Sequence, residues 1–248
     1  MTTELNKVSL VIATYNEEAS LGFVLNEISN YDFFEVIIVD NNSQDKTIDI
    51  ANKFNTKVIA QEKNGWGSAV VQAFNIAEGE FITYMDGDGS YNPKGIIEML
   101  KLINDYDFVC CSRYKFNNKS EDDTFIRAIG NKIFTFATKI LLKLDLTDSL
   151  FFYPLIRRKD YLKIKPESTN FGICIEIPFL LSQQGLKYTD ILSLERKRFA
   201  GESKVNAFTD GVKILFEVIS IISVGLLFII PHVNSLPLIY SSIIKYLP

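Results

Sequence analysis

Apolar residues form two patterns along this chain. The first is a set of short continuous apolar runs, which are typical of buried strands. These runs cover residues 8–13, 36–40, 57–60, 81–85 and 107–112. Between them, apolar residues recur every three or four positions, as on one face of a helix. The helical segments cover residues 18–30, the stretch from Asp45 to Phe54, and residues 69–76 and 93–104. Strands that alternate with helices form a mostly parallel sheet with right-handed crossovers, so we predict an α/β fold.

Polar residues gather where three of the predicted strands end. The first strand leads into residues 14–17 (TYNE), the second into residues 40–43 (DNNS) and the fourth into residues 86–89 (DGDG). The carboxyl ends of parallel strands open on one edge of a sheet, where ligands bind to proteins of this class. We therefore expect the three loops to line one crevice.

Asp86 and Asp88 are candidates for binding a cation. Residues i and i+2 of an extended chain point to the same side, so both carboxylates can close on one hard divalent ion. Gly87 and Gly89 leave room for a bulky ligand to approach the backbone. For an isolated pair of this kind, an Asp/Gly-rich turn is the better interpretation. The two neighbouring polar loops favour a binding site here.

Asp40 and Tyr15 are candidates for binding a nucleobase. A carboxylate at a strand end can accept hydrogen bonds from base N–H groups, and a tyrosine ring offers a flat surface beside it. Each residue taken alone is better interpreted as part of a turn or a helix cap. Their placement beside the acidic pair reverses that preference.

Composition excludes one class of partner. A net charge of −4 and a pI of about 5.2 carry no basic signature, so we expect no nucleic-acid partner. The 3 cysteines are odd in number and lack metal-ligand spacing, which favours reduced thiols and a cytosolic location of the domain. The chain begins with a polar segment and a strand, so we expect no signal peptide.

The C-terminal segment is unusually apolar. Between residues 214 and 230 the one ionisable residue is Glu217, and residues 236–247 form a second apolar stretch. A full membrane span needs about 20 apolar residues, so the first stretch is marginal in length. An interfacial or tilted helix, one short span and a buried contact in a homo-oligomer all remain open. We favour membrane association.

The strand-end motifs, in this order and spacing, resemble family 2 glycosyltransferases of the GT-A fold. Motifs further along narrow the resemblance to the dolichol- and polyprenyl-phosphate sugar synthases. They are residues 112–114 (SRY), Arg127 with Asn131, Glu176, and residues 198–204 (RFAGESK). The resemblance covers roughly residues 7–205. It predicts a GT-A domain over residues 1–205, with a Rossmann-like sheet flanked by helices, and an apolar helical tail over residues 206–248.

The resemblance implies a role for each candidate on the donor side. The residues expected to hold a nucleotide diphosphate sugar are Thr14, Tyr15, Glu17, Asp40, Asp86, Ser203 and Lys204. Asp86, Asp88 and Ser90 are expected to bind Mg²⁺ or Mn²⁺ on the diphosphate, and Asp88 is also counted as catalytic. Relatives often carry Gln at the position of Ser90, so a water would fill the remaining gap. A divalent cation neutralises the charge that develops on a diphosphate leaving group.

Basic residues supply the candidates for phosphate binding. Arg198, Ser203 and Lys204 match family positions that fold over phosphate, and Arg198 is counted as catalytic; a solvated charged loop is the alternative. The candidates for the phosphate of the acceptor are Arg113, Arg127 and Asn131. Arg127 and Asn131 are four apart and share a helix face, although such pairs are commonly plain surface residues.

The segment after Asp148 departs from the family pattern, because Phe152 replaces a Gly and Pro154 replaces an Arg. The nature of the acceptor is therefore open. An acceptor phosphate is already anionic near pH 7 and hardly needs a base, whereas a hydroxyl acceptor needs a carboxylate to take its proton. Asp148 is the candidate for that catalytic base, and a turn or cap role is the alternative.

The sequence thus predicts an inverting, metal-dependent glycosyltransferase. It would move a hexose from a GDP- or UDP-sugar to a polyprenyl (dolichyl) phosphate at the cytoplasmic face of a membrane. Two alternatives remain open. The acceptor can instead be a hydroxyl of a glycan or glycolipid, or the chain can be a non-catalytic membrane module that binds sugar nucleotides.

Overall fold

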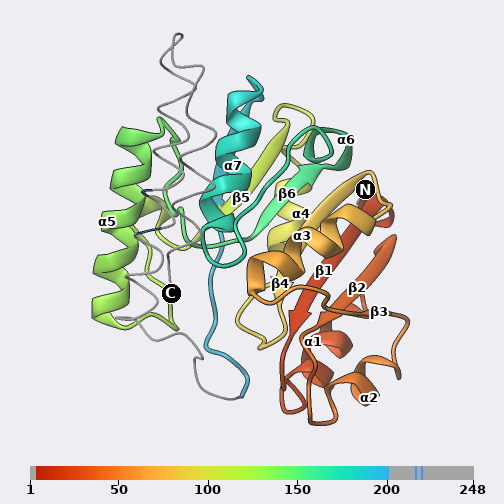
Figure 1. Ribbon diagram of the computed structural model, residues 1–248. Helices are drawn as coiled ribbons and strands as arrows, with labels where there is room; N and C mark the ends of the chain where they lie inside the picture. The colour runs from red at the N-terminus through yellow and green to blue at the C-terminus, as the bar shows by residue number, and fades with distance from the viewer. Residues whose placement is uncertain (1–3, 201–215, 217–218, 220–248) are drawn as a thin grey trace.

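A computed structural model describes residues 4–200, 216 and 219 of the chain (Figure 1). Within this part a seven-stranded sheet has the order β3-β2-β1-β4-β6-β5-β7. Its strands are β1 Val8–Thr14, β2 Glu35–Asp40, β3 Lys57–Ala60, β4 Phe81–Asp86, β5 Phe108–Ser112, β6 Pro154–Arg157 and β7 Tyr188–Leu192. Strand β6 runs antiparallel to both β4 and β5, and the other pairs are parallel. The predicted mostly parallel α/β sheet is confirmed.

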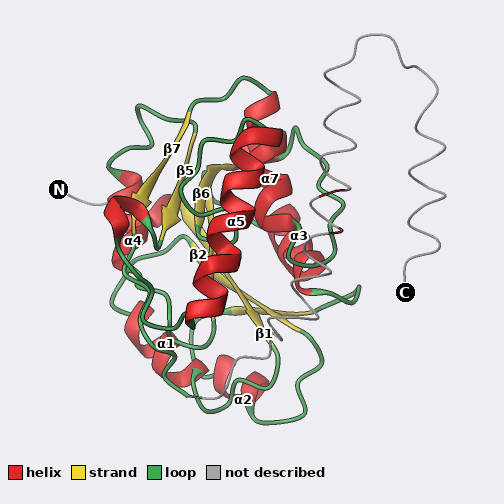
Figure 2. Ribbon diagram, turned by 90° about the vertical axis from the view of Figure 1, so that its left-hand side faces the viewer, coloured by secondary structure: helices red, strands yellow, loops and turns green. Residues whose placement is uncertain are grey.

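Helices cover both faces of the sheet. They are α1 Leu21–Ile28, α2 Thr47–Ala51, α3 Trp66–Ile76, α4 Lys94–Leu100, α5 Phe125–Leu141, α6 Arg158–Tyr161 and α7 Ile173–Gln183, with short 3-10 helices η1 Glu4–Lys7 and η2 Lys115–Asn117. Figure 2 shows α4 on one side of the sheet and α3 and α7 on the other, while α5 stands at the outer edge in Figure 1. Among the described residues, no helix is both long enough and apolar enough to cross a membrane.

The central strands carry the core. The fully buried residues include Leu10 and Ile12 of β1, Ile37 and Ile38 of β2, and Ile82 of β4. Because helices cover both faces of these strands, their sequences are continuous apolar runs and do not alternate between apolar and polar residues. The sequence therefore predicts their positions well. The edge strand β3 is half exposed.

Helix α1 is shorter than predicted, because the residues before it bond to another loop. The backbone N–H of Glu18 donates to Asp45, and the Glu18 carboxylate accepts from the backbone N–H of Lys46. This exchange holds residues 18–20 in a turn, so the helix begins at Leu21. The two loops that follow β1 and β2 are thereby tied together.

Gly65 and Gly67, at the start of α3, allow a close approach to the backbone of residues 168–170. Gly67 lies within α3, and a Cβ there would stand 2.6 Å from the carbonyl oxygen of Asn170. Gly65 has a φ of +102°, which side chains other than hydrogen disfavour. The facing segment is itself fixed, because the Glu176 carboxylate accepts a 2.7 Å hydrogen bond from the backbone N–H of Ser168.

Gly67→Ala is therefore expected to destabilise the protein. The added methyl group must displace backbone atoms, and such overpacking costs about 1–3 kcal/mol. Gly130→Ala in α5 is the matched control, since a Cβ at that position meets nothing within 4 Å. It should gain roughly 0.5–1 kcal/mol from helix propensity. Urea unfolding of both variants measures the difference, and similar effects at the two sites would contradict this packing argument.

Candidate active site

A cavity of about 560 Å³ opens beyond the carboxyl ends of β1 and β4. It brings together most of the predicted site residues: Thr14, Tyr15, Glu17, Asp86, Asp88, Arg113, Arg127, Asn131 and Arg198. Asp40, Ser90 and Asp148 are buried and do not belong to the described lining. The described residues do not include Ser203, Lys204 or, apart from residues 216 and 219, the apolar tail.

The Asp86 carboxylate lies at the end of a hydrogen-bonded chain. Trp66 Nε1 donates to the Tyr84 hydroxyl at 2.7 Å, and that hydroxyl donates to Asp86. Tyr84 and Asp86 are two apart on β4 and share one side of the strand, so this partner was visible in the sequence but was missed. Burial raises the pKa of Asp86 to about 7, and the nearby charge of Asp88 adds to the rise.

The Asp88 carboxylate is fixed on both oxygens. Oδ1 accepts from the backbone N–H of Ser90 at 2.9 Å and from its hydroxyl at 2.7 Å, while Oδ2 lies 3.2 Å from the Arg198 guanidinium. Ser90 thus orients Asp88, and its direct contact with a metal stays a prediction.

The acidic pair suits a divalent cation. Both carboxylates line the cavity, and the pKa of Asp86 is raised by burial and by a like charge, a penalty that a cation would relieve. The described residues contain no cluster of three or more Asp, Glu, His or Cys placed to hold a metal. Asp86 and Asp88 would therefore hold the ion together with phosphate oxygens and water, as is usual for Mg²⁺.

At the carboxyl ends of β1 and β2, the side chain of Asp40 joins the loops that follow these two strands. Its carboxylate accepts from the Thr14 hydroxyl at 2.8 Å, and from the hydroxyl and backbone N–H of Ser43 at 2.6 and 2.8 Å. Tyr15 is half exposed at the cavity rim, beside Asn41, which sequence reasoning did not select. The contact of Asp40 with a nucleobase stays a prediction. In this structure the Asp40 carboxylate is hydrogen-bonded to Thr14 and Ser43 in the two loops.

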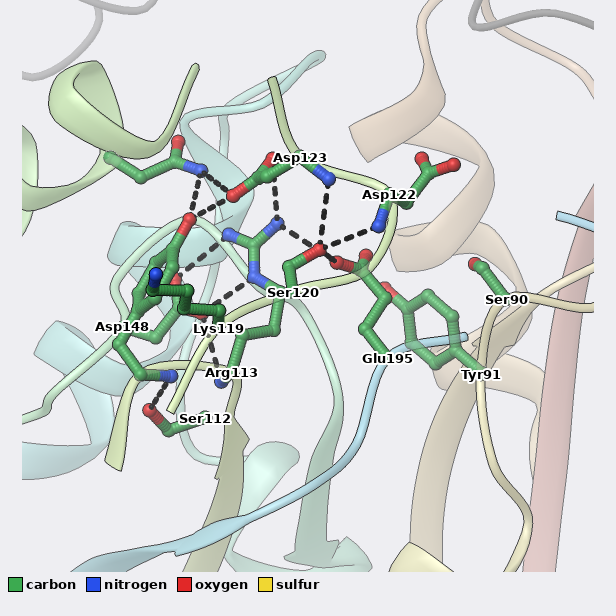
Figure 3. Close-up of polar contacts among 12 residues, drawn as sticks. Ser90, Tyr91, Ser112, Arg113, Lys119, Ser120, Asp122, Asp123, Asp148 and Glu195 are labelled. Carbon is green, nitrogen blue, oxygen red and sulfur yellow. Dashed lines mark hydrogen bonds and ion pairs between the residues drawn. The ribbon is translucent and has the colours of Figure 1, made fainter. Parts of the chain in front are cut away.

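Arg113 lies buried in the cavity wall among three carboxylates (Figure 3). It donates to Asp148 through Nε at 2.7 Å and through a terminal nitrogen at 3.0 Å, and its other terminal nitrogen lies 3.8 Å from Asp123 and 3.7 Å from Glu195. Burial alone would lower its pKa, but Asp148 and Glu195 hold that pKa well above the ordinary value. Arg113 therefore stays charged, and its charge is shared among these acids.

Asp148 lies behind the cavity wall. Its side chain is fully buried, and it also accepts from the backbone N–H of Arg113 at 3.1 Å. The expected role as a general base thus has no geometric support in this structure. Asp148 instead sets the position of the guanidinium that reaches the cavity.

The loop before α5 adds acids that the sequence pattern did not reveal. Arg198 donates to Asp122 at 2.8 Å and so links this loop to Asp88. Asn131 in α5 donates its amide to the Tyr114 hydroxyl at 2.9 Å and to Asp123 at 3.2 Å. The predicted sharing of one helix face by Arg127 and Asn131 agrees with the place of both in the lining.

Glu195 is the acid that sequence reasoning missed most plainly. It lies just before the basic residues 196–198, lines the cavity, and accepts a hydrogen bond from the Ser120 hydroxyl. Burial raises its pKa to about 7, partly offset by Arg113. Its neighbours Arg196, Lys197 and Arg198 are basic, so the sequence pattern alone does not single it out.

Phe152 and Pro154 have structural explanations. Phe152 lines the cavity and packs edge-on against Trp66, with ring centroids 5.7 Å apart, and its ring also contacts Tyr84. Pro154 opens β6, where its missing N–H is tolerated, and its carbonyl accepts from Thr83. Both residues that depart from the family pattern thus have a structural role in packing or in the sheet.

The sequence model described as Glycosyl transferase family 2 matches residues 9–164, which include the strand-end loops and the acidic pair. The chain belongs to this family. It is a family 2 glycosyltransferase, as the resemblance predicted.

Two curated relatives of this glycosyltransferase carry related names. A dolichyl-phosphate hexose transferase of Haloferax volcanii is 30% identical over 210 residues, which span 84% of this chain and 90% of the relative. A dolichol-phosphate mannosyltransferase of Pyrococcus furiosus is 29% identical over 214 residues, 82% of this chain but 60% of the relative. The fold is similar to that of glucosyl-3-phosphoglycerate synthase from Mycobacterium tuberculosis, crystallised with Mn²⁺, UDP and glucosyl-3-phosphoglycerate. The TM-score is 0.67 and the sequence identity 15%, over 87% of this chain and 80% of the other. These likenesses confirm the GT-A-like fold.

Asp148→Ala should destabilise this glycosyltransferase by about 3 kcal/mol, because it removes the main partner of a buried guanidinium. Thermal unfolding measures the effect, with Asp145→Ala as a control at a solvent-exposed carboxylate in the same loop. A variant that keeps full stability and loses turnover would restore the catalytic interpretation of Asp148.

Glu195→Gln should stabilise the protein at high pH. The pKa of Glu195 is about 7 in the folded protein, against an ordinary value of 4.5. Its protonated form therefore contributes fully to folding stability below pH 4.5, and this contribution is lost as the pH rises through 7. Removing the charge should thus raise stability at pH 8 by on the order of 1–3 kcal/mol and change it little at pH 4. Unfolding scans at both pH values test the sign, and an equal effect at the two would contradict it.

Proposed function

We propose that this enzyme transfers a hexose, with inversion, from a GDP- or UDP-sugar to a polyprenyl phosphate at the cytoplasmic face of a membrane. The observation that carries the proposal is that one cavity is lined both by the carboxylate pair Asp86 and Asp88 and by the arginines Arg113 and Arg127. The first suits a metal-bound diphosphate and the second suits a phosphate acceptor. The names of the curated relatives support the same acceptor class.

The donor would bind across the carboxyl ends of β1 and β4. Mg²⁺ or Mn²⁺, held by Asp86 and Asp88, would neutralise the diphosphate leaving group. Arg198, 3.2 Å from Asp88, is placed to add a second positive charge on the same phosphates. Tyr84 and Ser90 keep the two carboxylates in position, so little reorganisation accompanies reaction. Ser203 and Lys204 stay predictions on the donor phosphates.

The acceptor would enter beside α5, where Arg113, Arg127 and Asn131 line the cavity. A phosphate oxygen is anionic near pH 7 and attacks the sugar without a base. The withdrawal of Asp148 from the cavity is consistent with such an acceptor, because no proton needs to be removed.

A hydroxyl acceptor on a glycan or glycolipid is the second candidate, and Glu195 favours it. Glu195 lines the cavity with a pKa of about 7, which suits a general base. Family membership and the names of the relatives favour an enzyme over a non-catalytic module.

Membrane attachment is also part of the proposal. The apolar stretch at residues 214–230 supports it, and the buried thiols of Cys110, Cys111 and Cys174, which form no disulfide, are consistent with a cytoplasmic domain. A domain boundary near residue 205 and assembly into a homo-oligomer stay predictions.

Transfer of labelled hexose from GDP- and UDP-sugars with Mn²⁺ tests the acceptor class. Polyprenyl phosphate and the polyprenol of the same chain length are the paired acceptors. The proposal expects product with the phosphate alone. Product with the alcohol, lost in Glu195→Gln, would favour the second candidate.

Asp88→Asn should lower turnover by roughly 100-fold or more while the protein stays folded, because a charged oxygen ligand is lost at constant size. Excess chelator should have the same effect on the wild type. Retained turnover in either experiment would exclude the metal role.

A further inference from the structure

The segment that carries Arg198 is held against helix α1 by an aromatic stack. The ring of Phe199 stacks on the ring of Phe23 in α1, with centroids 4.3 Å apart and planes inclined by 9°. Phe23 is 40% exposed and Phe199 is 57% exposed, so this pair lies at the surface and does not belong to the core. The stack therefore acts mainly on the segment that carries Phe199.

An ion pair ties the same segment to the same helix. The guanidinium of Arg196 donates to both carboxylate oxygens of Glu27 at 2.9 Å. Phe23 and Glu27 are four residues apart in α1, so they present one face of the helix to residues 196–199. Neither residue belongs to the described lining of the cavity. Phe23 and Glu27, here called the α1 dock, thus hold the segment from outside the active site.

The backbone of the segment is bonded to the loop of the acidic pair. The N–H of Phe199 donates to the carbonyl of Asp88 at 2.8 Å, and the N–H of Arg196 donates to the carbonyl of Ser90 at 2.9 Å. Gly89 lies between the two acceptors with a φ of +84°, and a Cβ there would stand 3.0 Å from the Cβ of Phe199. The space over Gly89, which we expected a ligand to use, is therefore taken by the stacked aromatic pair.

Arg198 lies between these anchors. Arg196 and Phe199 are each fixed through side chain and backbone, and the Arg198 guanidinium lies 3.2 Å from Asp88 Oδ2. A free arginine side chain has many rotamers, so a fixed backbone on both sides narrows the positions that its charge can reach. This precision matters for catalysis, because a misplacement of about 1 Å can lower a rate by roughly 100-fold.

We propose that Phe23 and Glu27 are positioning residues of this glycosyltransferase. They dock residues 196–199 on α1 and thereby set the place of the Arg198 guanidinium beside Asp88. For its effect on turnover, this inference rests on the proposed role of Arg198 on the donor phosphates. The docking itself requires only the contacts of the α1 dock.

A role in stability alone explains these contacts less well. The Glu27–Arg196 pair is partly exposed, and such ion pairs contribute little to folding stability. The stack, the ion pair and two backbone hydrogen bonds nevertheless converge on residues 196–199. Contacts concentrated on the segment that carries Arg198 favour a role in its placement.

Amide hydrogen exchange of the full chain tests the docking. Phe23→Ala should speed exchange in a peptide covering residues 194–200 at least about tenfold, because its hydrogen bonds to the loop of the acidic pair open more often. Exchange in β1 and β4 should stay unchanged. The matched control is Phe34→Ala, which removes an exposed phenylalanine outside α1 and should leave the peptide as in the wild type. Unchanged exchange in Phe23→Ala overturns the proposal.

Glu27→Gln tests the second half of the α1 dock, because it removes the charge that faces Arg196 and keeps the length of the side chain. Exchange in the same peptide should become faster, by roughly threefold or more. Exchange that stays at the wild-type rate would exclude Glu27 from the dock.

A double-mutant cycle on turnover tests whether the dock acts through Arg198. Transfer of labelled hexose should fall about tenfold in Phe23→Ala when Arg198 is present. In the Arg198→Ala background the same substitution should change turnover by less than about twofold, because residues that act as one unit are not additive. A loss of stability would occur in both backgrounds and cancel. An equal fall in both backgrounds would show a merely structural role and overturn the proposal.

Phe23→Tyr is the conservative variant, because it keeps an aromatic ring in the stack. It should bring both the exchange rate and turnover to within about twofold of the wild type. A Phe23→Tyr variant as defective as Phe23→Ala would show that the stack does not position the segment.

The two readouts distinguish this inference from the proposed function. If the wild type transfers hexose to neither polyprenyl phosphate nor polyprenol, the proposed function fails, while faster exchange in Phe23→Ala still supports the docking. If the wild type transfers hexose and Phe23→Ala matches it in exchange and in turnover, the proposed function stands and this inference fails.

Discussion

The balance of buried charge constrains this active site more than any other interaction. Six acids surround two arginines: Asp86, Asp88, Asp122, Asp123, Asp148 and Glu195 lie around Arg113 and Arg198. Carboxylates in a poorly solvated wall repel one another unless cations or protons compensate them. Burial, and to a smaller extent this repulsion, raises the pKa values of Asp86 and Glu195. A cavity in this condition favours the entry of a cation.

Arg198 couples the two ends of the cavity. It contacts Asp88 at the end of β4 and Asp122 in the loop before α5, two segments that no strand pairing connects. Any charge that enters beside Asp88 therefore acts on that loop as well. The end of β4 and the loop before α5 are thus linked through one side chain.

Helix α5 shows how one periodic segment serves two environments. The spacing that turns Arg127 and Asn131 to the cavity turns Ile133 and Phe136 away from it. The sheet is covered by other helices, so α5 adds little to the core and its apolar face stays at the surface.

The sequence by itself determined the strands β1 to β5 and the acidic pair, because a buried parallel strand is a continuous apolar run and because residues two apart share one side of it. Only the tertiary structure decided that β6 inserts antiparallel between β4 and β5, that Asp148 withdraws to hold Arg113, 35 residues away, and that Glu195 reaches the cavity. These contacts join residues far apart in the chain. No periodic pattern in the local sequence predicts these contacts, because their free energy comes from burial and charge pairing that exist only once the sheet has assembled.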